Sequence, residues 1–136
     1  PLATGNTFLL NHEVGYDDDG SAMTSFIESA PMDMGDGEKF VSIRRVIPDI
    51  TFDGSTSVNP SVDFTIKARN FPGDTFDQTS SQATTRSSTS PVEQFTNKLD
   101  FRIRGRAFVL RIDSSSLGCR YKLGTPRIDI RQDGKR

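Results

Sequence analysis

The sequence contains one cysteine, one histidine and no tryptophan in 136 residues. Because Cys119 is alone, neither an intrachain disulfide nor a cysteine-based metal site is possible. Acid–base and nucleophilic catalysis usually recruit histidine, but His12 stands in a polar stretch with no recognisable nucleophile beside it. Carboxylates are plentiful, yet none stands in a context that would raise its pKa by burial. We therefore expect a protein that is not an enzyme and needs no cofactor.

Long hydrophobic runs are also missing. No stretch of 18 or more apolar residues exists, and residues 1–5 have neither the basic start nor the apolar run of a signal peptide. We expect a soluble protein without a membrane partner. The length suits one domain, residues 1–136, and the lean apolar content of 33% with ten phenylalanines predicts a thin core, as between two sheets. Since the first residue is not Met, we expect a processed or engineered chain or a piece of a longer one.

Alternation of apolar and polar residues predicts β-strands over residues 62–69, 99–104 and 108–112. The apolar positions change from odd to even across Gly105, which requires a bulge or turn there. Residues 22–29, 40–52 and 121–131 are further strand regions, with an edge or bend at Pro48. No helical stripe is present. We predict an all-β antiparallel module, sandwich-like or a partly open barrel, with one shared core that comprises Phe64, Ile66, Phe101, Ile103, Phe108, Leu110 and Ile112.

The connections are predicted from composition. Asp-Gly pairs at residues 19–20, 36–37 and 53–54 favour tight turns, because they supply positive φ angles. Residues 73–90 hold ten serines and threonines and one sizeable apolar residue, which predicts a flexible loop or else a loop that contacts a partner. The triplet Asp17 to Asp19 before Gly20 is a weak calcium candidate through Asp17 and Asp19, because the spacing then departs from a calcium loop. A solvated turn is the simpler interpretation, and we expect no metal.

Charge is distributed unevenly. Residues 1–97 carry six basic against fourteen acidic side chains, net −8, whereas residues 98–136 carry eleven against four, net +7. Such halves fit packing against a neighbouring copy better than nucleic-acid binding, although phosphate contact stays open. Strand alternation aims Arg102 and Arg104 away from the core, where we expect them to meet acidic groups of the same or an adjacent copy. The expected interface arginines are Arg102, Arg104, Arg106, Arg127 and Arg131.

Several short segments resemble one known family. They are FRIRGRAF (101–108), RIDS (111–114), LGTPRIDIRQDGKR (123–136), IES (27–29), MGDGEKF (34–40), RVIPD (45–49), KARNFPG (67–73) and PVEQFT (91–96). In order and spacing they resemble the C-terminal region of tail nozzle or tail stabilisation proteins of short-tailed bacteriophages, over roughly residues 12–136. One departure is Arg120-Tyr121, where that family has an aromatic residue, often Trp, slightly earlier.

The resemblance implies a structural component of the virion tail and no catalytic residues. The chain would be the C-terminal fragment of a longer tail protein, present in several copies in a ring around the DNA exit channel. Its partners would be copies of itself, other tail or portal-adaptor proteins, and DNA that passes without sequence-specific binding. The rival function is a carbohydrate-binding or host-adhesion β-sandwich, which the absence of Trp and the presence of only two Tyr count against.

Overall fold

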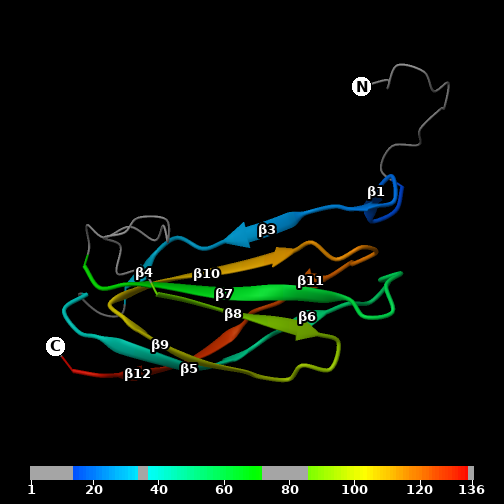
Figure 1. The fold of residues 1–136 in the computed structure, drawn as a ribbon. Coiled ribbons are helices and arrows are strands. Elements are labelled where there is room, and N and C mark those ends of the chain that lie inside the picture. The colour runs from blue at the N-terminus through cyan, green and yellow to red at the C-terminus, as the bar shows by residue number, and fades with distance from the viewer. Residues whose placement is uncertain (1–13, 34–36, 72–85, 135–136) are drawn as a thin grey trace, which may run out of the picture.

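The computed structural model describes residues 14–33, 37–71 and 86–134, and these residues form an all-β, antiparallel fold (Figure 1). Within those ranges there is no helix, and so none that could cross a membrane. The strands are β1 (Asp17–Asp18), β2 (Ser21–Ala22), β3 (Ser25–Glu28), β4 (Met32–Asp33), β5 (Val41–Ile47), β6 (Ile50–Thr51), β7 (Ser61–Arg69), β8 (Arg86–Glu93), β9 (Leu99–Gly105), β10 (Ala107–Ser114), β11 (Lys122–Leu123) and β12 (Arg127–Gln132). The predicted fold class is confirmed.

Two larger sheets form a sandwich. One has five strands in the order β3-β10-β7-β8, with β4 also paired to β10, and the other has three in the order β12-β5-β9. Two short ribbons, β1-β2 and β6-β11, complete the fold. The described strands form no closed barrel, and their arrangement is consistent with the sandwich-like module of the prediction.

The core lies between the two larger sheets. In β7 every second side chain is buried, and the register sets Ala68, Ile66 and Phe64 opposite Phe108, Leu110 and Ile112 of β10. Strands β5 and β9 of the other sheet contribute apolar side chains to the same cluster. Six of the seven predicted core residues are buried in it, and Leu110 is partly buried against it. The prediction of one shared core is confirmed.

Gly105 is the point where the chain passes from one sheet to the other. Strand β9 pairs with β5, whereas β10, which begins after Arg106, pairs with β7. A Cβ atom at position 105 would lie 2.9 Å from the Cβ of Ala68 and 3.0 Å from the carbonyl oxygen of Arg69, so a side chain has no room there. The Arg106 N–H donates to that same oxygen at 2.9 Å. The parity change predicted a bulge or turn, and its physical form is a change of sheet.

Two of the predicted Asp-Gly turns lie in the described residues. Asp19 and Gly20 have φ values of 46° and 82° and join β1 to β2, and Gly54, at 83°, follows β6. Asp36 of the third pair lies outside the described residues. The predicted bend at Pro48 is confirmed, because β5 ends at Ile47 and β6 begins at Ile50.

The predicted flexible loop over residues 73–90 needs a correction at its end. Residues 72–85 lie outside the described part of the chain, but residues 86–90 form the first half of β8. Strand β8 pairs with β7 from Arg86 opposite Ala68 to Glu93 opposite Ser61. The Ser/Thr-rich composition wrongly predicted a loop for residues 86–90. The hydrogen bonds between strands come from the backbone, and a strand at the edge of a sheet needs few apolar side chains.

Candidate interaction surface on the three-stranded sheet

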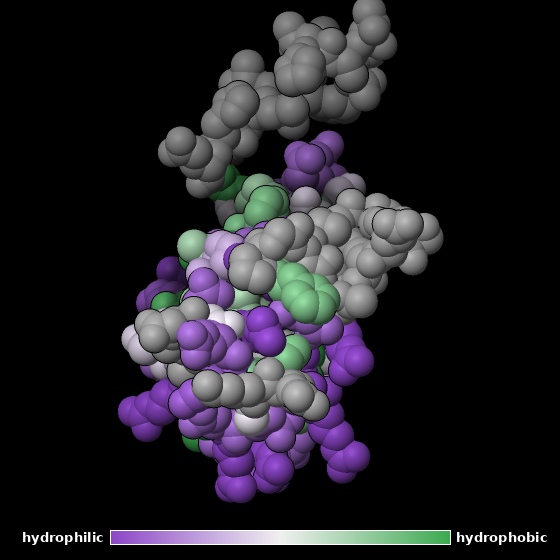
Figure 2. Space-filling view, turned by 90° about the vertical axis from the view of Figure 1, so that its left-hand side faces the viewer, coloured by the Kyte–Doolittle hydropathy of each residue, from purple (hydrophilic) through white to green (hydrophobic). Residues whose placement is uncertain are grey.

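The outer face of the three-stranded sheet carries a concentration of arginines. Alternation along β5, β9 and β12 turns the apolar residues into the core and the charged residues outward. We call this surface the basic face, and its members are Ser42, Arg44, Arg45, Asp100, Arg102, Arg104, Arg127, Asp129 and Arg131. In Figure 2 the lower part of the molecule, where this sheet lies, is mostly hydrophilic, with long side chains projecting from it.

Four of the five arginines expected at an interface lie on the basic face. The register sets Arg131 of β12 opposite Ser42 of β5, and Ser42 opposite Arg104 of β9, so that these three form a row across the sheet. Arg102 lies two residues before Arg104 on the same face, and Arg127 lies opposite Ile47. Residues from both ends of the 98–136 segment are thereby brought together.

Arg106, the fifth expected arginine, lies just after the last residue of β9. It follows β9 at the change of sheet, and its guanidinium lies 4.7 Å from the centre of the Phe40 ring. The guanidinium of Arg104 lies against the same ring, so the side chain of Arg106 ends near that of Arg104 although Arg106 stands outside β9.

Arg104 is held in place by a clamp at the C-terminal end of β12. Its Nε atom donates to Asp133 Oδ2 at 2.6 Å, and its guanidinium lies 4.1 Å from the centre of the Phe40 ring. Ser42 also donates its hydroxyl to Asp133, at 3.4 Å, and backbone bonds of 2.8 Å join Phe40 to Asp133 and Gly134. Arg104 therefore meets an acidic group of its own chain, as the sequence predicted.

Arg44 and Arg45 are surface arginines that the sequence reasoning missed. Strict alternation would place one of these neighbours in the core, but a β-bulge between Ile43 and Arg45 leaves both exposed. The signal was available, because two adjacent arginines inside an otherwise apolar strand indicate a bulge. Arg45 contacts Asp100 at 3.6 Å and lies opposite Asp129, so a stripe of alternating sign crosses the face.

A groove of about 940 Å³ runs between the basic face and β8. It is lined by Ser42, Ile43, Arg44, Arg86, Ser88, Asp100, Phe101, Arg102, Ile103 and Arg104. Within the described part of the chain, Arg44, Arg86 and Arg102 have neither an ion pair nor a hydrogen bond from their side chains. Three guanidinium groups are thus available to carboxylates or phosphates of a partner.

The calcium candidate has another use in the fold. Asp17 accepts a hydrogen bond from the Gly118 N–H, which ties the β1-β2 hairpin to the loop after β10. Asp19 lies in the hairpin turn itself. In the described ranges no three His, Cys, Asp or Glu side chains are grouped as a metal site requires. His12 lies outside those ranges.

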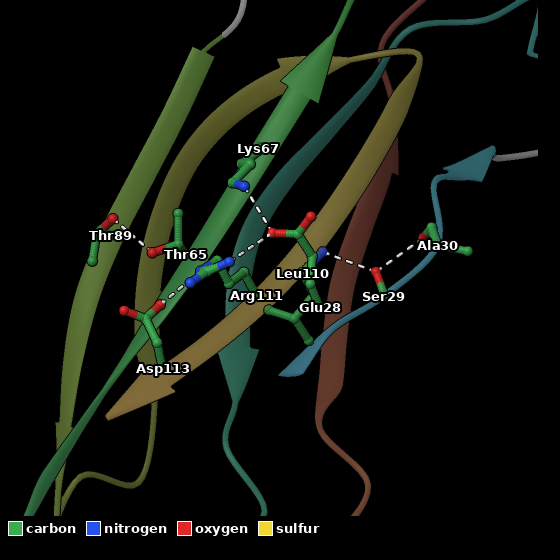
Figure 3. A network of polar contacts seen from close by, with 9 residues as sticks. All are labelled: Glu28, Ser29, Ala30, Thr65, Lys67, Thr89, Leu110, Arg111 and Asp113. Atoms are coloured by element: carbon green, nitrogen blue, oxygen red, sulfur yellow. Dashed lines mark hydrogen bonds and ion pairs between the residues drawn. The ribbon is translucent and has the colours of Figure 1, made fainter. Parts of the chain in front are cut away.

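The outer face of the five-stranded sheet carries a connected polar network instead (Figure 3). Glu28 of β3 accepts a hydrogen bond from Lys67 Nζ at 2.7 Å and contacts Arg111 at 3.4 Å, and Arg111 also contacts Asp113 at 3.3 Å. The hydrogen bond from Lys67 lowers the pKa of Glu28, against a smaller opposing effect of burial, and the charges of Lys67 and Arg111 add to the lowering. Glu28 thereby attaches β3 to β10 and β7.

Comparisons with known proteins add no relative to this picture. No protein-family model matches the chain, and no curated protein matches its sequence. The function must therefore be argued from the surfaces of the chain itself.

Proposed function

We propose that this chain is a structural module of a short-tailed bacteriophage tail. It assembles with copies of itself into a ring of the tail nozzle, where other tail or portal-adaptor proteins adjoin it and DNA passes without sequence-specific contact. It carries no catalytic site and resides in the virion. The order and spacing of the segments that resemble tail nozzle proteins support this proposal, and so does the all-β sandwich.

One observation carries the assembly role: arginines without partners lie together around one groove, between the three-stranded sheet and β8. Arg44, Arg86 and Arg102 border one groove, and in the described part of the chain they have no ion pair. Exposed charges of this kind add little to the stability of a fold, whereas charge complementarity sets the specificity and orientation of contacts between proteins. A face built this way suits a partner rather than the interior of its own chain.

The mixed sign of the basic face favours a protein partner over DNA. Asp100 and Asp129 flank Arg45 in the middle of the face and would repel phosphates. Surfaces for single strands usually provide exposed aromatic side chains for stacking. None is exposed in the described part of this face, because Phe40, which contacts Arg104, is buried. A protein partner such as a neighbouring copy can offer carboxylates to the available arginines and basic groups to Asp100 and Asp129, so it suits a face of mixed charge.

The oligomeric state of the chain tests this proposal. We expect sedimentation velocity at low salt to detect oligomers that dissociate as salt screens the charges. The variant Arg44→Glu/Arg102→Glu should weaken this association, and the matched control Lys122→Glu, on the β6-β11 ribbon, should not. A chain that stays monomeric up to high concentration at low salt would contradict the proposed ring.

A further inference from the structure

The five-stranded sheet has two open edges, β3 and β8. Its path runs β3-β10-β7-β8, and in the described residues neither β3 nor β8 pairs with a strand on its outer side. Figure 3 shows Ser29, which follows β3, and Thr89 of β8 on opposite sides of this sheet. All four residues of β3 are exposed, including Phe26 at 65% and Ile27 at 55%. An exposed edge strand is a template for pairing with another chain.

The two edge strands run in opposite directions. Each neighbouring pair along the path is antiparallel, so β3 runs in the direction of β7, and β8 in the direction of β10. When a second copy continues the sheet in the same orientation, its β3 therefore lies antiparallel to β8 of the first copy. Such a contact joins two different surfaces, and repeated head to tail it closes into a ring when the rotation permits.

The backbone groups on the open side of β3 belong to Phe26 and Glu28. The N–H of Ser29 donates to the carbonyl oxygen of Leu110 in β10 at 2.9 Å, and N–H groups along an antiparallel strand point alternately to its two sides. The N–H groups of Phe26 and Glu28 thus point away from β10. Their side chains lie on the outer face of the sheet, where Glu28 contacts Lys67.

On β8, the residue that combines an open backbone with an outward side chain is Thr89. The N–H of Glu93 donates to the side chain of Thr96 at 3.0 Å rather than to β7, so by alternation the N–H of Thr89 also points to the open side. The side chain of Thr89 lies on the outer face, 2.8 Å from Thr65 Oγ1 (Figure 3). Pro91, on the same side of the strand, has no N–H, as is usual at an edge that faces away from the sheet.

We propose that β3 of one copy pairs antiparallel with β8 of the next, with Phe26 opposite Thr89. Opposite residues in a sheet share a face, and those of a hydrogen-bonded pair exchange two backbone bonds. Phe26 and Thr89 meet both requirements. In this register Ile27 lies opposite Ser88, which borders the arginine-lined groove. The inference rests on the proposed ring and names the contact between its copies.

The limits of the two edges select this register. A shift of two residues in one direction sets Phe26 opposite Pro91, which offers no N–H. A shift of two residues in the other direction carries Glu28 past Arg86, the first residue of β8. A shift of one residue brings an outward side chain opposite an inward one. Phe26 opposite Thr89 is therefore the register that uses the whole of β3.

Cysteine cross-linking tests the contact. In a Cys119→Ser background, Phe26→Cys/Thr89→Cys places one thiol on each edge, and opposite residues of a hydrogen-bonded pair stand about 5.5 Å apart between Cα atoms, within disulfide reach. Mild oxidation should join the chains into covalent multimers larger than dimers, which a denaturing gel without reductant resolves. The matched control, Ile27→Cys/Thr89→Cys, places the thiols on opposite faces of the sheet and should form no such multimers. Circular dichroism shows whether each variant is folded.

Proline at position 89 tests the backbone bonds. Thr89→Pro removes an N–H on the open side and none that pairs with β7, so the fold should survive while self-association weakens by about tenfold or more. The control Thr89→Val keeps the N–H and should associate like the wild type. Sedimentation velocity at low salt measures the association of both variants.

The outcomes separate this inference from the proposed function. Multimers from Phe26→Cys/Thr89→Cys and a loss of association in Thr89→Pro support the contact between β3 and β8. If the wild type associates while the cysteine pair forms no multimers and Thr89→Pro associates normally, this contact is overturned and the ring must use another surface. Covalent dimers from Phe26→Cys alone would mean that two β3 strands pair with each other, which also overturns it. A wild-type chain that stays monomeric overturns both proposals.

Discussion

The two sheets use their charged side chains differently. On the five-stranded sheet, Lys67, Glu28, Arg111 and Asp113 satisfy one another in a chain of contacts that fastens β3. On the three-stranded sheet, arginines outnumber carboxylates, and Arg44 and Arg102 have no ion pair among the described residues. One outer face thus satisfies its charges within the fold, and the other leaves two arginines for the association that we propose.

The inner faces of the two sheets are alike, because both contribute apolar side chains to one core. The largest effect that we expect comes from a substitution in this core. Truncation of Phe101 to Ala should lower the free energy of unfolding by about 3 to 5 kcal/mol, because its ring is buried in the core shared by both sheets. Denaturant melts followed by circular dichroism measure the loss. The matched control is Phe95→Ala, since Phe95 is 91% exposed and its truncation should cost under about 0.5 kcal/mol. Equal losses of unfolding free energy for the two variants would mean that the side chain of Phe101 faces outward.

The network on the five-stranded sheet predicts a dependence on pH. The pKa of Glu28 is lower in the folded chain than its ordinary value of 4.5. Its stabilising effect is therefore fully present above that ordinary value and is lost as pH falls through the lower, folded pKa. Glu28→Gln should melt at a lower temperature than the wild type at pH 7, and this difference should vanish in acid.

The Glu28→Gln substitution should lower the free energy of unfolding at pH 7 by less than about 1 kcal/mol, since the Glu28 ion pairs are partly exposed to solvent. Glu93→Gln is the control, because Glu93 is also an exposed strand carboxylate and has no ion pair in the described residues. A melting difference for Glu28→Gln that persists unchanged below pH 3 would show that the carboxylate charge does not fasten β3.

The smallest effect is expected on the basic face. Arg102→Gln should leave the melting temperature of the dissociated chain unchanged within error, because Arg102 contacts no acidic group in the described residues. Arg104→Gln should lower it slightly, by removing the ion pair with Asp133 and the contact with Phe40. Thermal melts at high salt, where association is screened, compare the two. A larger loss for Arg102→Gln would mean that its side chain supports the fold.

Much of the fold follows from local pattern, because side chains in a strand alternate and this chain alternates cleanly. The strict pattern of residues 62–69 determined β7 and its inward face, and the parity change located the break at Gly105. Pairing between distant strands could not be predicted in this way, since alternation states which face is apolar and not which strand is the neighbour. The row from Arg131 through Ser42 to Arg104 depends on such pairing.

The candidate surface was only partly predictable for the same reason. Arg102 and Arg104 were expected to point outward, and they do. Arg44 joins them only because β5 has a bulge between Ile43 and Arg45 and pairs with β9. Arg106 was grouped with them because the sequence indicates a break in the strand at Gly105 but not the course of the chain after it. The Ser/Thr-rich start of β8 was missed because backbone pairing leaves no apolar signal.

The change of sheet at Gly105 also has a mechanical consequence. Strands β9 and β10 are continuous backbone with Arg106 alone between them, so covalent bonds, and no flexible loop, transmit a displacement of one sheet to the other. Strand β10 in turn carries β3 through four residue pairs, whereas its ladder with β7 has seven. A tensile load applied between the three-stranded sheet and β3 would therefore pass along β9 and β10 and reach β3 through the shorter of these two ladders.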